Sequence, residues 1–293
     1  MRKIIVTGAL GQLGKAVLKE YETDPDVLLV PVSHQDLAIE NLDSVREIFL
    51  KEQPDVVINC AAYTNVDGCE QRESEANRIN GVGPRNLAIY CEKVGAKLIQ
   101  ISTDYVFNGC GERPYRESDR PMPVSAYGRS KLVGEMYTAN LCTRHMIIRT
   151  AWLYGDGKNF LNTMLSLSKD HDKITVVDDQ IGCPTSTAEL ARMIHYLEPT
   201  EQYGLYHGVC GGQVSWAGFA KEIFHLKNIA TEVVPITTEE YKRQHPTSAN
   251  RPQYSVLENQ MLTLIFPEGE PGFVMKDWKT ALKDYLEADV DAG

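Results

Sequence analysis

The sequence predicts an α/β protein built on a doubly wound parallel sheet. Short runs of apolar, β-branched residues alternate with helical patterns through the first half of the chain, an order typical of βαβ units. A turn rich in glycine follows the first of these runs. A length of 293 residues suffices for one domain of ordinary size and a smaller lobe. We therefore expect two lobes.

The first strand is expected at residues 4–6 and leads into TGALGQLG, residues 7–14. Gly8, Gly11 and Gly14 recur every three residues. This spacing lets the chain turn sharply, a pyrophosphate approach the bare backbone, and the next helix pack closely on the strand. The phosphates would then lie at the helix N-terminus, where backbone N–H groups are unpaired. The pattern differs from the usual G-x-G-x-x-G fingerprint of a Rossmann domain, so a glycine-rich turn without a ligand is the alternative.

The second strand is expected at residues 27–33, with Pro31 at its end or edge. A carboxylate that binds the adenosine ribose normally follows this strand. Here the chain continues instead with Ser33, His34 and Gln35, which would not repel a 2′-phosphate. We therefore expect NADPH as the cofactor, in a site that tolerates NADH as well.

The remaining elements follow the same alternation as far as residue 150. Near-continuous apolar runs suit strands that helices cover on both faces. Ser125 is placed to cap a helix that carries Tyr127, Lys131 and Glu135 on one face. Strands are expected at 55–61, 98–102, 145–150, 174–177 and 205–209, and helices at 42–51, 80–94, 159–169, 187–197 and 215–226. Because the alternation then becomes irregular, we expect an NADP(H)-binding domain over residues 1–150, to which segments near 174–226 return, and an interleaved C-terminal substrate-binding lobe over 151–293.

Composition narrows the class of partner. A net charge of −10 argues against nucleic acid or an anionic membrane, because both attract clustered Lys and Arg. We see no apolar run approaching a membrane span and no secretory leader pattern, so we expect a cytoplasmic protein. The seven cysteines are scattered without a C-x-x-C pair, which favours neither a disulfide framework nor a zinc site.

Three side chains form a candidate catalytic group. Tyr127 and Lys131 stand four residues apart on the predicted helix, and Thr103 follows a predicted buried strand upstream. An unperturbed tyrosine titrates near pH 10, and a fixed positive charge nearby favours its phenolate. We therefore expect Lys131 to lower the pKa of Tyr127, which would exchange a proton with an alkoxide that Thr103 also holds. Lys131 would in addition reach the nicotinamide ribose and fix the geometry of hydride transfer; a chance Tyr–Lys pair on an exposed helix is the alternative.

Together these motifs resemble the extended short-chain dehydrogenase/reductase family and, within it, the dTDP-4-dehydrorhamnose reductases. The glycine turn and the Tyr-x-x-x-Lys pair are shared across the larger family, whereas STDYVF at 102–107 and RTAWLYG at 149–155 are much narrower. Other segments that resemble the narrower family are 36–37, 59–64, 180–185 and 251–252. The resemblance implies a Rossmann fold that reduces the C4 ketone of dTDP-4-dehydro-6-deoxy-L-mannose (dTDP-4-dehydro-L-rhamnose) with hydride from NADPH, giving dTDP-L-rhamnose for cell-surface polysaccharide.

The resemblance also implies a role for each matching residue. The catalytic residues would be Thr103, Tyr127 and Lys131. The cofactor would contact Gly8, Gly11, Gln12, Leu13, Gly14, Asp36, Leu37, Ala61, Ala62 and Tyr63, together with Tyr127 and Lys131. The dTDP-linked 4-keto-6-deoxyhexose would contact Thr103, Asp104, Tyr105, Trp152 and Arg251. For Trp152 a core tryptophan is the alternative, and for Arg251 a surface arginine before a proline turn.

Two departures from related proteins limit what the resemblance implies. Some family members are described with a magnesium ion at a dimer contact formed by glutamates, but Lys15 stands where an acidic ligand would be wanted. We therefore expect no metal, interpret Glu189 as a helix-face charge, and leave the oligomeric state open. In the related nucleotide-sugar dehydratases an Asp–Glu pair follows the strand-end threonine, whereas here Asp104 is followed by Tyr105.

A neutral phenol is a poor base for a carbon acid. We therefore expect ketone reduction without dehydration, unless Tyr105 merely packs and a base comes from elsewhere in the pocket. The fold also allows a reductase or epimerase of another nucleotide sugar, or a non-catalytic NADP-binding regulatory subunit.

Overall fold

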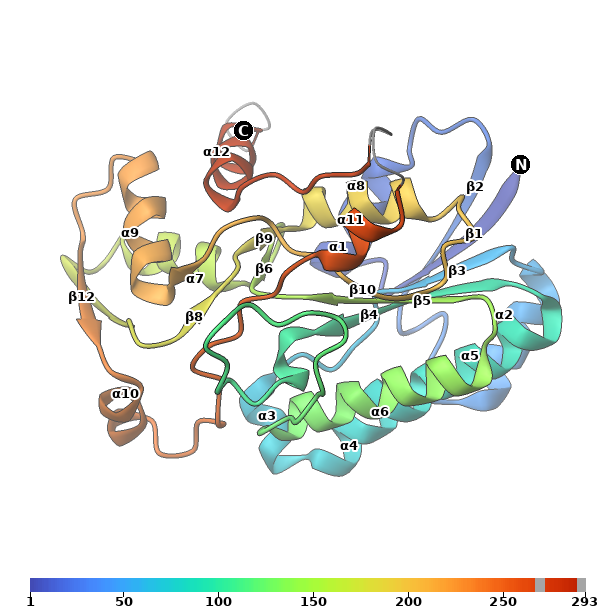
Figure 1. Cartoon of the computed structure of the whole chain (residues 1–293), viewed down its shortest axis with the longest axis horizontal. Coiled ribbons are helices and arrows are strands. Elements are labelled where there is room, and N and C mark those ends of the chain that lie inside the picture. The colour runs from blue at the N-terminus through green and yellow to red at the C-terminus, as the bar shows by residue number, and fades with distance from the viewer. Residues whose placement is uncertain (267–271, 289–293) are drawn as a thin grey trace.

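A sheet of six parallel strands forms the centre of the molecule (Figure 1). The structure is a computed structural model that describes residues 1–266 and 272–288. Across the sheet, the strands are β10 (Gly204–His207), β5 (His145–Thr150), β4 (Lys97–Thr103), β3 (Val56–Asn59), β1 (Arg2–Thr7) and β2 (Val27–Val32), and each neighbouring pair is parallel. The chain passes from β1 to β2 and then places β3 on the opposite side of β1. Ligands of open α/β sheets bind at the carboxyl ends of the strands beside such a reversal. The predicted doubly wound parallel sheet is confirmed.

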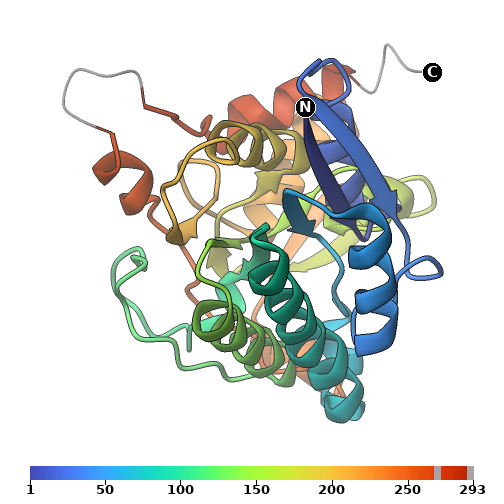
Figure 2. The same ribbon diagram turned by 90° about the vertical axis from the view of Figure 1, so that its right-hand side faces the viewer.

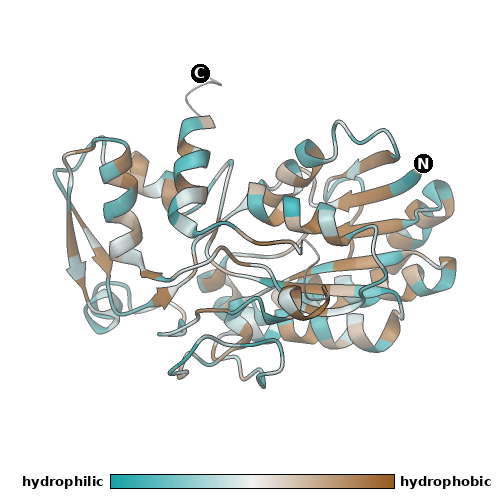
Figure 3. Cartoon of the chain, turned by 45° about the horizontal axis from the view of Figure 1, so that its top comes forward, coloured by the Kyte–Doolittle hydropathy of each residue, from teal (hydrophilic) through white to brown (hydrophobic). Residues whose placement is uncertain are grey.

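Helices cover both faces of this sheet (Figures 1 and 2). One face carries α1 (Gln12–Glu20) and α8 (Thr187–Leu197), and the other carries α2 (Leu42–Glu52), α5 (Gly83–Val94) and α6 (Ala126–Leu141). All residues of β3 and β4 are buried, which explains their near-continuous apolar sequences, and Figure 3 shows the hydrophobic residues concentrated in the strands. As predicted, the Ser125 side chain caps α6 by accepting a hydrogen bond from the Gly128 N–H.

Several local details differ from the predicted elements. The strand expected at 55–61 ends at Asn59, because the chain then passes over Gly8, where a Cβ would lie 2.8 Å from the Ala61 nitrogen. The helix expected at 80–94 begins with a π-helical turn, η1 (Arg78–Val82), before α5. Two short helices, α3 (Val66–Gln71) and α4 (Glu73–Asn77), precede that turn, and a single 3-10 turn, η2 (Asp104–Val106), follows β4.

The second lobe is built from later segments of the chain and lies beside the carboxyl ends of the strands (Figure 1). Two of its strand pairs are parallel, β7 (Lys173–Val177) with β12 (Glu232–Ile236) and β6 (Leu153–Tyr154) with β9 (Thr185–Ser186). A third pair, β8 (Ile181–Gly182) with β11 (Val214–Ser215), is antiparallel. Its helices are α7 (Phe160–Leu167), α9 (Trp216–Leu226), α10 (Thr238–Gln244) and α12 (Trp278–Ala288), whereas α11 (Gln260–Leu264) packs on β10 of the six-stranded sheet. Between residues 174 and 226 the chain visits both lobes: α8 and β10 lie with the six-stranded sheet, whereas β7 does not enter it and packs with β12 and α9.

Glu189 has charged partners and is not available as a metal ligand on its own. Glu189, at the start of α8, is buried and forms ion pairs with Arg192 at 2.6 Å and Lys276 at 3.5 Å. Within residues 1–266 and 272–288, no group of three or more His, Cys, Asp or Glu side chains is arranged to hold a metal ion. No helix in the same residues is both long enough and apolar enough to cross a membrane.

Candidate active site

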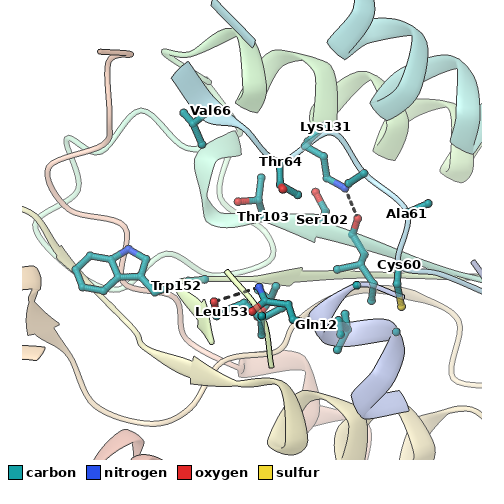
Figure 4. A pocket seen from close by; sticks show the side chains of 18 of the residues that line it. Gln12, Cys60, Ala61, Thr64, Val66, Ser102, Thr103, Lys131, Trp152 and Leu153 are labelled. Carbon is teal, nitrogen blue, oxygen red and sulfur yellow. Dashed lines mark hydrogen bonds between the residues drawn. The ribbon is translucent and has the colours of Figure 1, made fainter. Parts of the chain in front are cut away.

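A cavity of about 660 Å³ lies at the carboxyl ends of β3, β4 and β5, between the two lobes (Figure 4). Lys131 and Thr103 reach in from one side, Gln12 and Leu153 lie opposite, and Trp152 stands at one end. Twelve of the residues predicted for the site line this cavity: Gly11, Gln12, Leu13, Gly14, Ala61, Ala62, Thr103, Asp104, Tyr105, Tyr127, Lys131 and Trp152. The sheet therefore brings together residues that are far apart in the sequence.

The glycine turn forms one wall of the cavity. Gly8 has a φ of +62°, a conformation that glycine adopts without strain. A Cβ on Gly14 would clash with the Gly8 carbonyl oxygen, so only glycine allows α1 to start this close to β1. Gly11 is the N-cap residue of α1 and offers no side chain to its first turn. The first N–H groups of α1 are therefore free for an external anion.

Tyr127 lies on α6 with its ring edge-on to Tyr105, 5.5 Å between centroids. The surrounding protein raises its pKa above 10 by excluding water; hydrogen bonding with Thr103 opposes this rise, and the Asp104 carboxylate adds to it. Our prediction that Lys131 lowers the pKa of Tyr127 is therefore wrong. The physical reason is the direction of the ammonium group, which donates a hydrogen bond of 2.6 Å to the Ile101 carbonyl oxygen (Figure 4).

Lys131 and Asp104 are both buried, and burial favours the neutral form of each. Burial lowers the pKa of Lys131 to about 8, against the attraction of the Glu135 carboxylate. Burial likewise raises the pKa of Asp104 to about 6, although the neighbouring side chains of Ser255 and Thr103 favour its ionised form. One oxygen of Asp104, Oδ1, accepts from the Thr103 hydroxyl at 2.9 Å, and the other has no hydrogen-bond partner within the described chain. Asp104 therefore keeps a free acceptor beside the candidate catalytic group.

Trp152 is held in an unusual conformation. Its φ of +45° is in the left-handed region, which costs energy for a residue with a side chain. Its indole stacks on that of Trp216, with 3.4 Å between ring centroids and 4° between planes, and Gly182 packs so closely that a Cβ there would clash with the ring. The sequence had not indicated Trp216, which comes from the start of α9 in the second lobe. Further lining residues outside the segments predicted for the site include Val66, Lys158 and Phe160.

Five predicted site residues lie outside the cavity lining. Gly8 is behind the turn, and Leu37 is buried in the core beneath α2. Asp36 accepts hydrogen bonds from the N–H and hydroxyl of Ser33 at 2.8 and 2.6 Å. Tyr63, like Tyr127, packs against the cluster of Cys69, Ala76 and Ala126. Arg251 forms an ion pair with Asp67 at 2.9 Å.

Known proteins that resemble this chain in sequence and fold include dTDP-4-dehydrorhamnose reductases. The family model of the RmlD substrate binding domain matches residues 1–290. The spore coat polysaccharide biosynthesis protein SpsK of Bacillus subtilis is 39% identical over 288 residues, which covers 98% of each chain. The dTDP-4-dehydrorhamnose reductase of Streptomyces griseus is 38% identical over 97% of this chain and 93% of its own.

Solved structures agree over the whole fold. The crystal structure of a dTDP-4-dehydrorhamnose reductase from Clostridium acetobutylicum is 46% identical, with a TM-score of 0.93 over 98% of this chain and 99% of its own. The dTDP-4-dehydrorhamnose reductase of Bacillus anthracis, solved in complex with NADP, is 40% identical, with a TM-score of 0.91 and the same coverage. The chain belongs to the family of the RmlD substrate binding domain, among the dTDP-4-dehydrorhamnose reductases.

Proposed function

We propose that the chain reduces the C4 ketone of dTDP-4-dehydro-L-rhamnose with hydride from NADPH, giving dTDP-L-rhamnose for cell-surface polysaccharide. The observation that carries the proposal is one cavity that joins a glycine turn at a helix N-terminus to Thr103, Tyr127 and Lys131. The full-length relatives named dTDP-4-dehydrorhamnose reductase support it. With its net charge of −10, the enzyme acts on a small molecule in the cytoplasm rather than on nucleic acid or a membrane surface.

The residues at the turn fit a dinucleotide. The closeness of Gly14 to the Gly8 carbonyl and the uncapped N-terminus of α1 leave bare backbone where a pyrophosphate would lie. Gly11, Gln12 and Leu13 would hold the pyrophosphate, and Ala61, Ala62 and Lys131 would line the path to the nicotinamide. Bound NADPH supplies the hydride. Asp36 and Leu37 would contact the adenine side, beyond the cavity lining.

The proton in the proposed reaction comes from Tyr127. Its raised pKa keeps the phenol protonated at neutral pH, which is the form that a proton donor requires. Thr103 is placed to hydrogen-bond the same substrate oxygen, since its hydroxyl is already oriented by Asp104 at 2.9 Å. Lys131 would reach the nicotinamide ribose and so fix the geometry of hydride transfer.

The remaining predicted residues would hold the sugar nucleotide. Asp104 offers its unpartnered oxygen to a sugar hydroxyl, and Tyr105 lies beside Tyr127. Trp152 would contact the deoxyhexose, with Trp216 behind it. Arg251 would bind the diphosphate, because a planar guanidinium fits phosphate oxygens.

Cofactor oxidation against a panel of dTDP- and UDP-linked 4-keto sugars tests the proposal. We expect turnover of the dTDP-4-keto-6-deoxyhexose, with one NADPH consumed per product. Preference for another nucleotide or sugar would assign a different reductase or an epimerase. Tight NADPH binding without turnover of any keto sugar would assign a regulatory subunit.

A further inference from the structure

Glu135 lies directly behind the candidate catalytic group, and the proposed mechanism gives it no role. It follows Lys131 by four residues on α6, so the two side chains lie on one face, a turn apart. Its Oε1 accepts hydrogen bonds from the Ser102 hydroxyl at 2.5 Å and from Arg149 Nε at 2.9 Å, and its Oε2 accepts from Arg149 Nη2 at 2.7 Å. The Arg149 and Glu135 side chains are only 3% and 6% exposed, so this is a bidentate ion pair within the protein interior.

The Glu135 carboxylate joins three elements at the edge of the active site. Ser102 and Arg149 are opposite each other in the register of β4 and β5, and Glu135 reaches both from α6. Ser102 stands between two residues of the site. Thr103 follows it, and Ile101, whose carbonyl accepts the hydrogen bond from Lys131, precedes it. Glu135 therefore fixes the end of β4, where Thr103 faces the cavity, relative to the helix that carries Lys131.

The titratable groups around Lys131 also identify Glu135 as the residue that acts on it. Lys131 is 4% exposed, and an ammonium in such a place loses most of its hydration. Two titratable groups act on it, Glu135 from α6 and Cys60 from the segment after β3. Burial raises the pKa of Cys60 to about 12, so its thiol is neutral at pH 7. Arg149 faces Glu135 from β5, and Tyr127, one turn earlier on α6, is a neutral phenol. The carboxylate that favours the charged form of Lys131 is therefore that of Glu135.

We propose that Glu135 is a positioning residue: it holds the end of β4 against α6 through Ser102, and it keeps the Lys131 ammonium charged at neutral pH, with Arg149 as its fixed counter-ion. The inference rests on the proposed function, because Lys131 matters to turnover only if the chain is a reductase.

The test is the pH profile of Glu135→Gln, which keeps the shape and an acceptor oxygen but removes the charge. We measure kcat/KM for the dTDP-4-keto sugar at saturating NADPH from about pH 6 to about pH 10. In the parent, activity falls on the alkaline side as Lys131 loses its proton. In the variant this fall should begin about one to two pH units lower, since one charge a helical turn away is removed. Activity at mildly acid pH should stay within about tenfold of the parent, because Lys131 is still protonated there.

A matched control separates this effect from the loss of any Glu–Arg pair on α6. Glu73 pairs with Arg129 of α6 at 2.9 Å, and both side chains are more than 40% exposed. Glu73→Gln should leave the pH profile unchanged, because water screens this pair. An unshifted profile in Glu135→Gln, or an equal shift in both variants, would overturn the proposal.

Two further measurements distinguish the charge effect on Lys131 from a loss of folding and from a failure of the proposed function. Since Glu135→Gln leaves Arg149 buried without a counter-ion, the double variant Glu135→Gln, Arg149→Gln removes both charges. Its profile should still be lowered relative to the parent, but by no more than in Glu135→Gln, because the repulsion by Arg149 is also gone. If the parent turns over no keto sugar, the proposed function fails. The charge effect is then read by NMR titration of carbon-13-labelled lysines in the parent and in Glu135→Gln, where an unmoved Lys131 resonance would overturn it.

Discussion

Replacing Tyr127 by Phe tests the proposed proton transfer, because the substitution removes the phenol hydroxyl and keeps the aromatic ring with its packing. The phenylalanine ring retains the edge-on contact with Tyr105 at 5.5 Å and the packing against Cys69, Ala76 and Ala126. The Thr103 hydroxyl keeps its hydrogen bond of 2.9 Å to Asp104, so no buried donor is left without a partner. We therefore expect the free energy of unfolding to change by no more than about 1 kcal/mol.

Turnover should respond very differently. Proton transfer from a positioned side chain contributes about 10²- to 10⁴-fold to rate, so kcat should fall by about that factor. Binding of NADPH should be retained, because the turn at Gly11 to Gly14 and Lys131 are unchanged. NADPH binding is followed by fluorescence titration, turnover by absorbance of the reduced cofactor, and stability by urea unfolding.

Tyr137 provides the control for this variant. It lies on the same helix but is 36% exposed and beside Arg85, away from the cavity, so Tyr137→Phe should leave turnover unchanged. Turnover of Tyr127→Phe within a few-fold of the parent would remove Tyr127 as the proton donor. A large loss of stability or of NADPH binding would show that the phenol acts by packing instead.

Three further outcomes follow from single residues. Folding raises the pKa of Asp104 to about 6, so its proton is bound more tightly in the folded state and the stability that this proton confers is lost as the pH rises through 6. Urea unfolding should therefore show Asp104→Asn gaining about 2 kcal/mol on the parent between about pH 4 and pH 7, and a pH-independent difference would refute the assignment. Because Asp36 is engaged by Ser33 at 2.6 and 2.8 Å, NADPH should be accepted at least as well as NADH in paired titrations; a strong NADH preference would contradict this account of the site. Because Tyr105 stands where a second carboxylate would be needed, incubation with dTDP-glucose and catalytic cofactor should yield no 4-keto-6-deoxy product, and its accumulation would refute the reductase assignment.

The sheet could be predicted because burial on both faces leaves a direct mark on the sequence. The residues of β3 and β4 are all buried, so their apolar runs have no polar alternation. The place of β7 was harder to predict. Its residues alternate between exposed and buried, and nothing in such a strand says whether it joins the main sheet or pairs with β12, more than fifty residues later in the chain.

Site residues were predictable where their chemistry was distinctive and near a strand end. Thr103 and Tyr127 stand out by type and spacing, and the parallel sheet brings them to one edge. Trp216 could not be found this way, because its position against Trp152 depends on how α9 of the second lobe packs. The role of Ser102 likewise could not be predicted, because it depends on a hydrogen bond to Glu135, which is adjacent only in the folded chain.

The mistaken prediction for Tyr127 shows where spacing stops being informative. Four residues on a helix place Tyr127 and Lys131 on one face, but spacing does not say which group the ammonium meets. The fold turns it to the Ile101 carbonyl, and the exclusion of water raises the pKa of the phenol. A phenolate would be suited to oxidising an alcohol, since that direction needs a base, whereas a protonated phenol is suited to reducing a ketone. The protonated state of Tyr127 therefore depends on burial by the fold, which no local motif encodes.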